Sequence, residues 1–191
     1  ACGGLVTIFF EFFDTLTLSI FGAGHIGQNL VDIIKKMGYK IQLFDVREDF
    51  LNQFSEIDEV KKYLLKPIDK DNNQLFYVDE KPLSDFLQDG SFVVITTHGH
   101  AYDFSIAKYI LSIEKKFKYI GMVASKNKVS QFIEKLKSEN KNIYEKFLSS
   151  NFYSPIGLDI GGFSAREIAL SIASQIQSIR YGKNINSLSI I

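Results

Sequence analysis

The sequence predicts an α/β fold built on a doubly wound, mainly parallel sheet with helices on both faces. Short apolar runs typical of buried strands alternate along the chain with segments of helical periodicity. Near the N-terminus, a strand, a glycine-rich turn, a helix, a second strand and an acidic residue follow one another within about 30 residues. This series is typical of a Rossmann-like domain, and 191 residues are enough for one domain with a buried core.

The first element is an apolar segment, LVTIFFEFF, at residues 5–13. Its alternation predicts a strand that is buried on at least one side. Because an unpaired apolar strand tends to aggregate, we expect it to pair with its own sheet, another subunit or a further domain. We therefore predict two parts, an N-terminal strand segment at residues 1–14 and a Rossmann-like domain at residues 15–191.

The remaining strands and helices follow in order. The predicted strands are short apolar runs at residues 17–21, 41–44, 75–78, 92–96 and 119–123. The predicted helices lie at residues 26–37, from 84, at about 103–113, at 125–138 and from 164 onward. Ser164 and Glu167 predict a capping box at the start of the last helix. The highly charged residues 56–73 predict a surface excursion.

Composition excludes several classes of protein. Lys and Arg number 22, as do Asp and Glu, so the net charge of zero gives no general attraction to nucleic acid. A single cysteine cannot form an internal disulfide, and no apolar run reaches the roughly 18 residues of a membrane span. No signal peptide is visible at the first residues. We therefore expect a cytoplasmic protein with neither nucleic acid nor membrane as a partner.

The charge is nevertheless unevenly placed. Residues 45–89 hold twelve acidic against six basic residues, whereas residues 108–146 hold ten Lys against four Glu. Solvated helix faces explain such a pattern, and a lysine-rich rim that meets phosphates or an acidic partner is the sharper interpretation.

The glycine turn is the main chemical signal. Gly22 permits a tight turn, Gly24 lets the backbone approach a pyrophosphate, and Gly27 lets the helix pack closely on the strand. The helix N-terminus adds unpaired N–H groups and partial positive charge. Asp45 stands where a carboxylate would bind a ribose 2′-hydroxyl, but Arg47 could offset its charge, so NAD and NADP both remain open. A Rossmann scaffold adapted to another ligand is the alternative.

Histidines and threonines add candidate ligand contacts. His25 lies inside the glycine turn and can bind a phosphate or act as an acid or base. Thr97 and His98 follow a predicted strand at the carboxyl edge, where open α/β sheets bind ligands. His98, His100 and Cys2 match no closed zinc pattern, so we predict no metal site. The sequence defines no catalytic set.

A second glycine-rich stretch lies at residues 155–162, directly before the last helix. Its composition allows close approach to a ligand or to another chain. Asp159 within it is either a functional carboxylate or a turn-stabilising residue.

The order of the motifs resembles one protein family. The motifs are FGAGHIG, a strand ending in Asp45, TTHGH, YIGMVASKNK and PIGLDIGGFSAREIALSI. Together they resemble the XdhC/CoxI family of xanthine dehydrogenase accessory factors, from Cys2 to about Arg180. The last motif is far more specific than the glycine turn. Members of the family usually carry a further N-terminal domain, and the chain resembles the C-terminal half plus the final strand of that domain.

The resemblance implies a cofactor-handling chaperone rather than an enzyme that turns over substrate. Members of this family bind the molybdenum cofactor (a pterin that carries a phosphate), support its sulfuration by a cysteine desulfurase and assist its insertion into a molybdenum hydroxylase. We therefore expect an accessory role in maturation of a xanthine dehydrogenase-type enzyme, with the molybdenum cofactor or NAD(P) bound at the glycine turn. The expected cofactor-binding residues are Gly22, Gly24, His25, Gly27, Asp45, Thr97 and His98.

Two other functions are consistent with the same residues. One is an NAD(P)-dependent oxidoreductase, and the other is a non-catalytic nucleotide-sensing regulatory domain. We also expect a homodimer, because the apolar first segment and the alanine-lined last helix both offer packing surfaces.

Overall fold

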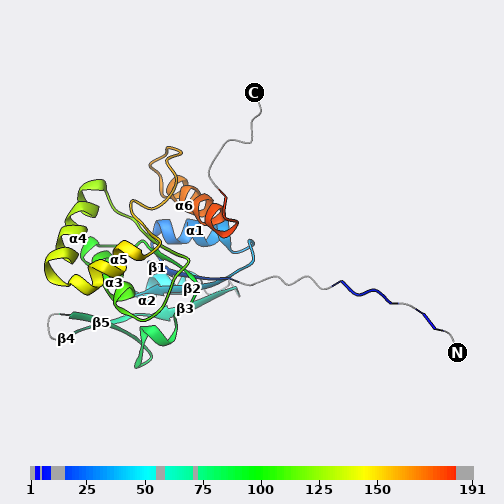
Figure 1. Ribbon diagram of the computed structural model, residues 1–191, viewed down its shortest axis with the longest axis horizontal. Coiled ribbons are helices and arrows are strands. Elements are labelled where there is room, and N and C mark those ends of the chain that lie inside the picture. Colours follow the sequence, from blue (N-terminus) through cyan, green and yellow to red (C-terminus); the bar gives the residue numbers. More distant parts are fainter. Residues whose placement is uncertain (1–2, 5, 10–15, 55–58, 71–72, 184–191) are drawn as a thin grey trace.

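A six-stranded parallel sheet forms the centre of the molecule (Figure 1). The computed structural model describes residues 3–4, 6–9, 16–54, 59–70 and 73–183. The strand order is β3-β2-β1-β7-β8-β9. The strands are β1 (Leu16–Phe21), β2 (Tyr39–Asp45), β3 (Val60–Leu64), β7 (Phe92–Ile95), β8 (Tyr119–Met122) and β9 (Phe152–Tyr153). The chain changes direction across the sheet between β1 and β7, which makes the carboxyl ends of these two strands the topological switch point. The predicted Rossmann-like fold class is confirmed.

Helices and a small second sheet cover the two faces. Helices α1 (His25–Ile34) and α6 (Ala165–Arg180) lie side by side on one face (Figure 1). The other face carries α3, α4, α5, a 3₁₀ helix and the antiparallel sheet β4-β5-β6. Their bounds are β4 (Lys66–Lys70), β5 (Asn73–Val78), β6 (Lys81–Pro82), the 3₁₀ helix (Leu83–Asp85), α3 (His100–Ser112), α4 (Lys126–Glu139) and α5 (Lys141–Ser149). The short helix α2 (Glu48–Asn52) packs in the cluster that contains α1 and α6.

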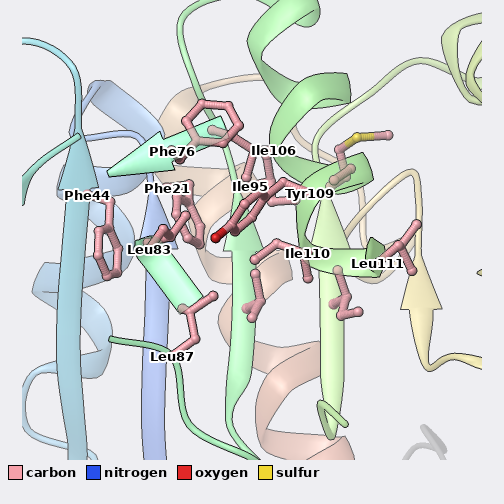
Figure 2. Close-up of a cluster of buried hydrophobic side chains, with 14 of the residues drawn as sticks. Phe21, Phe44, Phe76, Leu83, Leu87, Ile95, Ile106, Tyr109, Ile110 and Leu111 are labelled. Carbon is pink, nitrogen blue, oxygen red and sulfur yellow. The ribbon is translucent and has the colours of Figure 1, made fainter. Parts of the chain in front are cut away.

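Alternation along β1 divides the core into two clusters. Leu18 and Ile20 face α1 and α6, whereas Phe21 faces α3. Figure 2 shows the second cluster, in which Phe21 stacks on Phe44 with ring centroids 4.7 Å apart. Residues of β5, the 3₁₀ helix and α3 pack over this face of the sheet and complete the cluster. The aromatic pair therefore lies directly beneath the carboxyl ends of β1 and β2.

Buried polar side chains on the same face satisfy one another. The Ser19 hydroxyl donates to Gln42 Oε1 at 2.8 Å, and Gln42 Nε2 donates to the carbonyl of Phe86 at 3.0 Å. Thr17 donates to Gln88 at 2.8 Å. These bonds explain how polar residues occupy strand positions that face the core.

The small residues of α6 are used inside the chain. Ala169 and Ala173 are buried together with Ile172 in the cluster that contains α1. The alanine-lined face is therefore not available for a second copy, and this part of the reasoning for a homodimer is wrong.

The charged stretch at residues 56–73 was predicted as a surface excursion, and that prediction is wrong for most of it. It contains β3, which extends the main sheet, and β4, which begins the small one. β3 is an edge strand on which Lys61 and Lys62 are exposed, so its charge conceals its strand character. The predicted strand at residues 75–78 exists but belongs to the small antiparallel sheet. The predicted helix from Ser84 is the 3₁₀ helix, and α5 and β9 were not predicted.

The N-terminal segment does not form its predicted strand where the structure describes it. Residues 6–9 belong to no strand, and Val6, Ile8 and Phe9 are exposed. The rest of the predicted strand, at residues 5 and 10–13, lies outside the described residues. The division into residues 1–14 and 15–191 stays a prediction.

Within the described parts of the chain, no helix is both long and apolar enough to cross a membrane.

Candidate functional site

The glycine turn is held tightly between three strands of the sheet. The Gly22 N–H donates to the Phe44 carbonyl at 2.8 Å, and Gly22 has a φ of +118°. A Cβ atom on Gly22 would overlap the Thr96 carbonyl oxygen, and one on Gly27 would overlap the Gly22 carbonyl oxygen. Both positions therefore require glycine, one for its backbone conformation and contact, the other for the close packing of α1.

The N-terminus of α1 is open to a ligand. Gly24 is its N-cap residue and supplies no side-chain cap, and the first turn contains no acidic residue. The nearest atom to a Cβ placed on Gly24 would be Arg47 Nη2, 3.9 Å away. The first backbone N–H groups of a helix have no acceptor within it, and they carry partial positive charge. Such a terminus is suited to a phosphate.

A cavity of about 450 Å³ lies at this helix terminus. Its lining residues come from the glycine turn, the residues after β2 and β7, and the start of α6. They are Gly24, His25, Ile26, Arg47, Phe50, Thr96, Thr97, His98, Phe163, Ala165 and Ile168. A small adjoining space is lined by Gly22 and Asp45 together with Thr97 and His98.

Two larger surface hollows, of about 840 and 870 Å³, lie along α3, α4 and α5. Some of their charged groups already have partners within the chain. Lys108 forms an ion pair with Glu139, and Lys146 donates to the carbonyl of Ser112. We therefore place the candidate site at the glycine turn.

Asp45 and Arg47 form a two-pronged ion pair beside the cavity. Arg47 Nε donates to Asp45 Oδ1 at 2.9 Å, and Nη2 donates to Oδ2 at 2.8 Å. The Arg47 guanidinium also lies over the Phe50 ring, 3.7 Å from its centroid. Burial alone would raise the pKa of Asp45, but the hydrogen bonds from Arg47 and from the Ala23 N–H outweigh it and lower that pKa below its ordinary value. The pair is therefore charged at neutral pH.

The two threonines after β7 have different surroundings. Thr97 is bound within its own turn, because its N–H and its hydroxyl both lie within hydrogen-bond distance of Asp103 Oδ1, at 2.9 and 2.7 Å. Thr96 is buried, and its hydroxyl has no hydrogen-bond partner among the described residues. An unpaired buried hydroxyl is unfavourable, and Thr96 is one of the residues that line the cavity.

Two of the histidines face the cavity. His25 is the first residue of α1, and His98 follows β7 with its ring 5.3 Å from that of Tyr102. Both are exposed. His100 begins α3, and Cys2 lies outside the described residues. Across the described ranges, no three His, Cys, Asp or Glu residues form a group that could hold a metal ion.

The second glycine-rich stretch is fastened to α6. The Gly157 N–H donates to Gln175 Oε1 at 2.9 Å, and the Ser171 hydroxyl donates to the Leu158 carbonyl at 2.6 Å. Gly157 has a φ of +97°, and a Cβ on it would overlap the Ser171 hydroxyl. Asp159 is exposed and does not line the cavity.

The predicted capping box of α6 is confirmed. The Ser164 hydroxyl and N–H both donate to Glu167 Oε2, at 2.7 and 2.9 Å, and the Glu167 N–H lies 3.3 Å from the Ser164 hydroxyl oxygen. The backbone bond from Ser164 is the main cause of the lowered pKa of Glu167. The box fixes the preceding residue, Phe163, whose side chain is 98% exposed at the rim of the cavity.

The structure brings most of the predicted site residues together. Gly24, His25, Thr97 and His98 line the cavity, and Gly22 and Asp45 line the space beside it. Gly27 is buried at the contact between α1 and the glycine turn. Their role in cofactor binding stays a prediction.

Several lining residues were not among the predicted site residues, including Thr96, Phe50 and Phe163. The sequence does indicate Thr96 as a site residue, since it ends the apolar run that leads directly into Thr97. No sequence pattern indicates Phe50 or Phe163, because only the folded chain brings α2 and the start of α6 to the carboxyl edge of the sheet.

Comparison with known proteins places this geometry in a family. Residues 18–176 match the family described as the XdhC Rossmann domain. The chain is 24% identical over 180 residues to the Escherichia coli K12 protein named uncharacterized protein YqeB, covering 94% of this chain and 30% of that one. It is 25% identical over 166 residues to a Bacillus subtilis protein named as a probable xanthine dehydrogenase subunit, covering 85% of this chain and 42% of that one. The chain thus spans less than half the length of both relatives.

A solved structure shares the fold. A crystal structure described as a xanthine dehydrogenase from Bacillus halodurans superposes with a TM-score of 0.64 at 24% identity, covering 92% of this chain and 45% of the other. The family match extends from β1 to α6 and includes both strand-end turns and the capped last helix. The chain therefore belongs to the XdhC Rossmann domain family.

Proposed function

We propose that this chain is an accessory domain for the maturation of a xanthine dehydrogenase-type molybdenum hydroxylase, and that it binds a phosphate-bearing cofactor at the turn from Gly22 to Gly27. The family membership and a relative named as a probable xanthine dehydrogenase subunit support the accessory role. The molybdenum cofactor and NAD(P) are the two candidate ligands. A molybdenum hydroxylase is the proposed partner, and a cysteine desulfurase is a second one.

One observation carries the ligand proposal, namely the open N-terminus of α1 in the wall of the cavity. Every other described α-helix begins with a side-chain cap or an acidic residue in its first turn, and α1 has neither. The unpaired hydroxyl of Thr96 lies beside the same turn. An anion would satisfy both features, since it accepts from backbone N–H groups and from the hydroxyl.

The residues present suit either candidate ligand. A cavity of about 450 Å³ is within the usual range for small-molecule sites. In both ligands a phosphate would lie against Gly24 and the N–H groups of α1, and a planar ring could pack against the exposed Phe163. The bound cofactor would supply any chemistry, whereas the protein would hold and orient it.

Calorimetric titration tests this proposal. The purified chain is titrated with the molybdenum cofactor, NAD(H) and NADP(H), and the same titrations are repeated on Gly24→Val and on Gly99→Ala as a matched control. We expect binding of at least one ligand by the native chain and by Gly99→Ala, and a loss of at least tenfold in Gly24→Val. No binding of any of these ligands by a folded native chain would refute the proposed site.

Activity and association assays on the same purified protein distinguish the accessory role from the two alternative functions. Oxidation of NADH or NADPH with a small carbonyl acceptor would indicate an oxidoreductase. Nucleotide binding without turnover, coupled to a change in association state, would indicate a sensor. For the accessory role we expect no turnover, and co-purification with a molybdenum hydroxylase from cells that express both.

The homodimer is also a proposal, and it now depends on the N-terminal segment alone. The exposed side chains of Val6, Ile8 and Phe9 are available to another chain. Light scattering at micromolar concentration should give twice the monomer mass of 21.7 kDa. A monomeric mass would contradict the proposed dimer without bearing on the ligand.

A further inference from the structure

The carboxylate of Asp45 has no capacity left for a ribose hydroxyl. Its Oδ1 accepts from the Arg47 N–H at 3.0 Å and from Arg47 Nε at 2.9 Å. Its Oδ2 accepts from the Ala23 N–H at 2.7 Å and from Arg47 Nη2 at 2.8 Å. Since an ionised carboxylate offers about four lone-pair sites, these four bonds saturate it. A ribose 2′-hydroxyl, which must donate to this carboxylate in an NAD site, finds no free acceptor there.

Arg47 presents donors instead. Its Nε and Nη2 each use a hydrogen on Asp45, and the remaining N–H groups of the guanidinium are not committed to that carboxylate. Stacking on Phe50, with 3.7 Å to the ring centroid, fixes the plane of the guanidinium. About a quarter of the Arg47 side chain is exposed, and it lines the cavity.

The position of Arg47 suits a second phosphate on the same ligand. Its Nη2 lies 3.9 Å from the place of a Cβ on Gly24, so the guanidinium adjoins the backbone that would hold a pyrophosphate. Among the described residues that line the cavity, Arg47 is the one Lys or Arg. A planar guanidinium with free N–H groups recognises phosphate better than a hydroxyl, because the hydrogen bonds are charge-assisted.

We infer that Arg47 recognises a 2′-phosphate, so that this site prefers NADP(H) to NAD(H). This inference rests on the proposed function, in that it names the ligand of the same site. Asp45 then serves as a positioning residue for Arg47, rather than as the ribose-binding carboxylate that its place after β2 suggests.

Paired titrations with NADPH and NADH test the inference on the native chain and on two variants. Arg47→Ala removes the guanidinium, whereas Arg47→Lys keeps a cation beside the buried Asp45 and so protects the fold if the alanine variant is unstable. Lys40→Ala is the matched control, because Lys40 is an exposed cation at the opposite end of the same strand. Thermal unfolding of each variant establishes that it is folded.

The native chain and Lys40→Ala should bind NADPH about tenfold to a hundredfold more tightly than NADH. Arg47→Ala should lose this preference through weaker NADPH binding, whereas NADH binding should not weaken, because Asp45 loses two of its four donors and can then accept from a ribose hydroxyl. Arg47→Lys should lose most of the preference. Equal affinities in the native chain, tighter NADH binding, or an equal loss for both ligands in Arg47→Lys would overturn the inference while the proposed phosphate site stands. Binding of neither dinucleotide would also overturn it, and titration with the molybdenum cofactor would then decide the proposed function by itself.

Discussion

The turns that follow β1 and β7 occupy neighbouring positions at one edge of the sheet, yet the N-termini of the helices that they lead into differ in capping and charge. After β1, the chain brings backbone atoms of Gly22, Gly27 and Thr96 into contact and leaves the N-terminus of α1 without a cap or an acid. After β7, the buried carboxylate of Asp103 lies in the first turn of α3 and accepts from Thr97.

This difference shows what makes a strand-end turn available to a ligand. In the turn after β7, the Asp103 carboxylate acts as a built-in anion. It accepts hydrogen bonds from Thr97, and its negative charge lies at the positive end of the α3 dipole. The turn after β1 also presents the unpaired N–H groups of a helix N-terminus, but it contains no acidic side chain. Position at the carboxyl edge is therefore shared by both helices, and the absence of an internal acceptor distinguishes α1, the helix that we propose binds a phosphate.

The strongest test of the comparison replaces one glycine in each turn. Gly22→Ala should lower the free energy of unfolding by about 3 kcal/mol, because the new methyl group overlaps the Thr96 carbonyl and φ is +118°. Gly99→Ala should change it by less than about 1 kcal/mol, because no atom lies within 4 Å of the new Cβ. Urea unfolding measures both, and equal losses would contradict the described packing.

Removal of the built-in anion should have the next largest effect. Asp103→Ala deprives the Thr97 N–H and hydroxyl of their shared acceptor and should cost about 2 kcal/mol of unfolding free energy. Asp103→Asn keeps one acceptor oxygen and should cost less. If the asparagine variant loses as much as the alanine variant in urea unfolding, the charge rather than the hydrogen bonds stabilises the turn.

Gly24→Ala should separate binding from stability. Its new Cβ has Arg47 Nη2 at 3.9 Å as its nearest neighbour, so the unfolding free energy should change by less than about 1 kcal/mol. If a phosphate lies against the Gly24 backbone as proposed, a methyl group there should hinder its approach, and the affinity for the cofactor should fall at least tenfold. Calorimetry and urea unfolding on the same sample give both values, and unchanged affinity would place the phosphate elsewhere.

Thr96→Val tests the unpaired hydroxyl at nearly constant shape. Without ligand, the variant should be as stable as the native chain or more stable by up to about 1 kcal/mol, because a buried hydroxyl without a partner is removed. Ligand affinity should fall several-fold. A clear loss of stability in the free protein would show that the hydroxyl already has a partner.

The smallest expected effect concerns the loss of stability at acidic pH. The pKa of Asp45 in the folded chain is lowered, so its contribution to stability is complete above the ordinary aspartate pKa of about 4 and is lost as pH falls through the lower folded value. Urea unfolding between pH 7 and pH 3 should therefore show a loss of stability that is smaller in Asp45→Asn. Identical pH profiles would show that Asp45 titrates normally.

Local sequence patterns predicted the elements that place the site. The glycine turn, the periodicity of α1 and the capping box at Ser164 each depend on residues a few positions apart. β3 was missed because an edge strand carries charges such as Lys61 that resemble those of a loop.

The contacts on which the proposed ligand preference rests were not predicted from the sequence. The sequence placed Asp45 at the strand end, but the saturation of its carboxylate requires the conformation of Arg47 and the position of the Ala23 N–H. In the same way, no local pattern reports that the buried Thr96 hydroxyl lies beside Gly22 without a hydrogen-bond partner among the described residues.

The interlocked carbonyls of the glycine turn have a consequence for the kinetics of binding. Because the Gly22 carbonyl lies against Gly27 and the Thr96 carbonyl lies against Gly22, the N–H groups that we propose bind an anion are held in place without a ligand. The site is preorganised, and little backbone entropy is lost when it is filled. Ligands that share the same phosphate should therefore associate at similar rates and differ mainly in how long they stay bound.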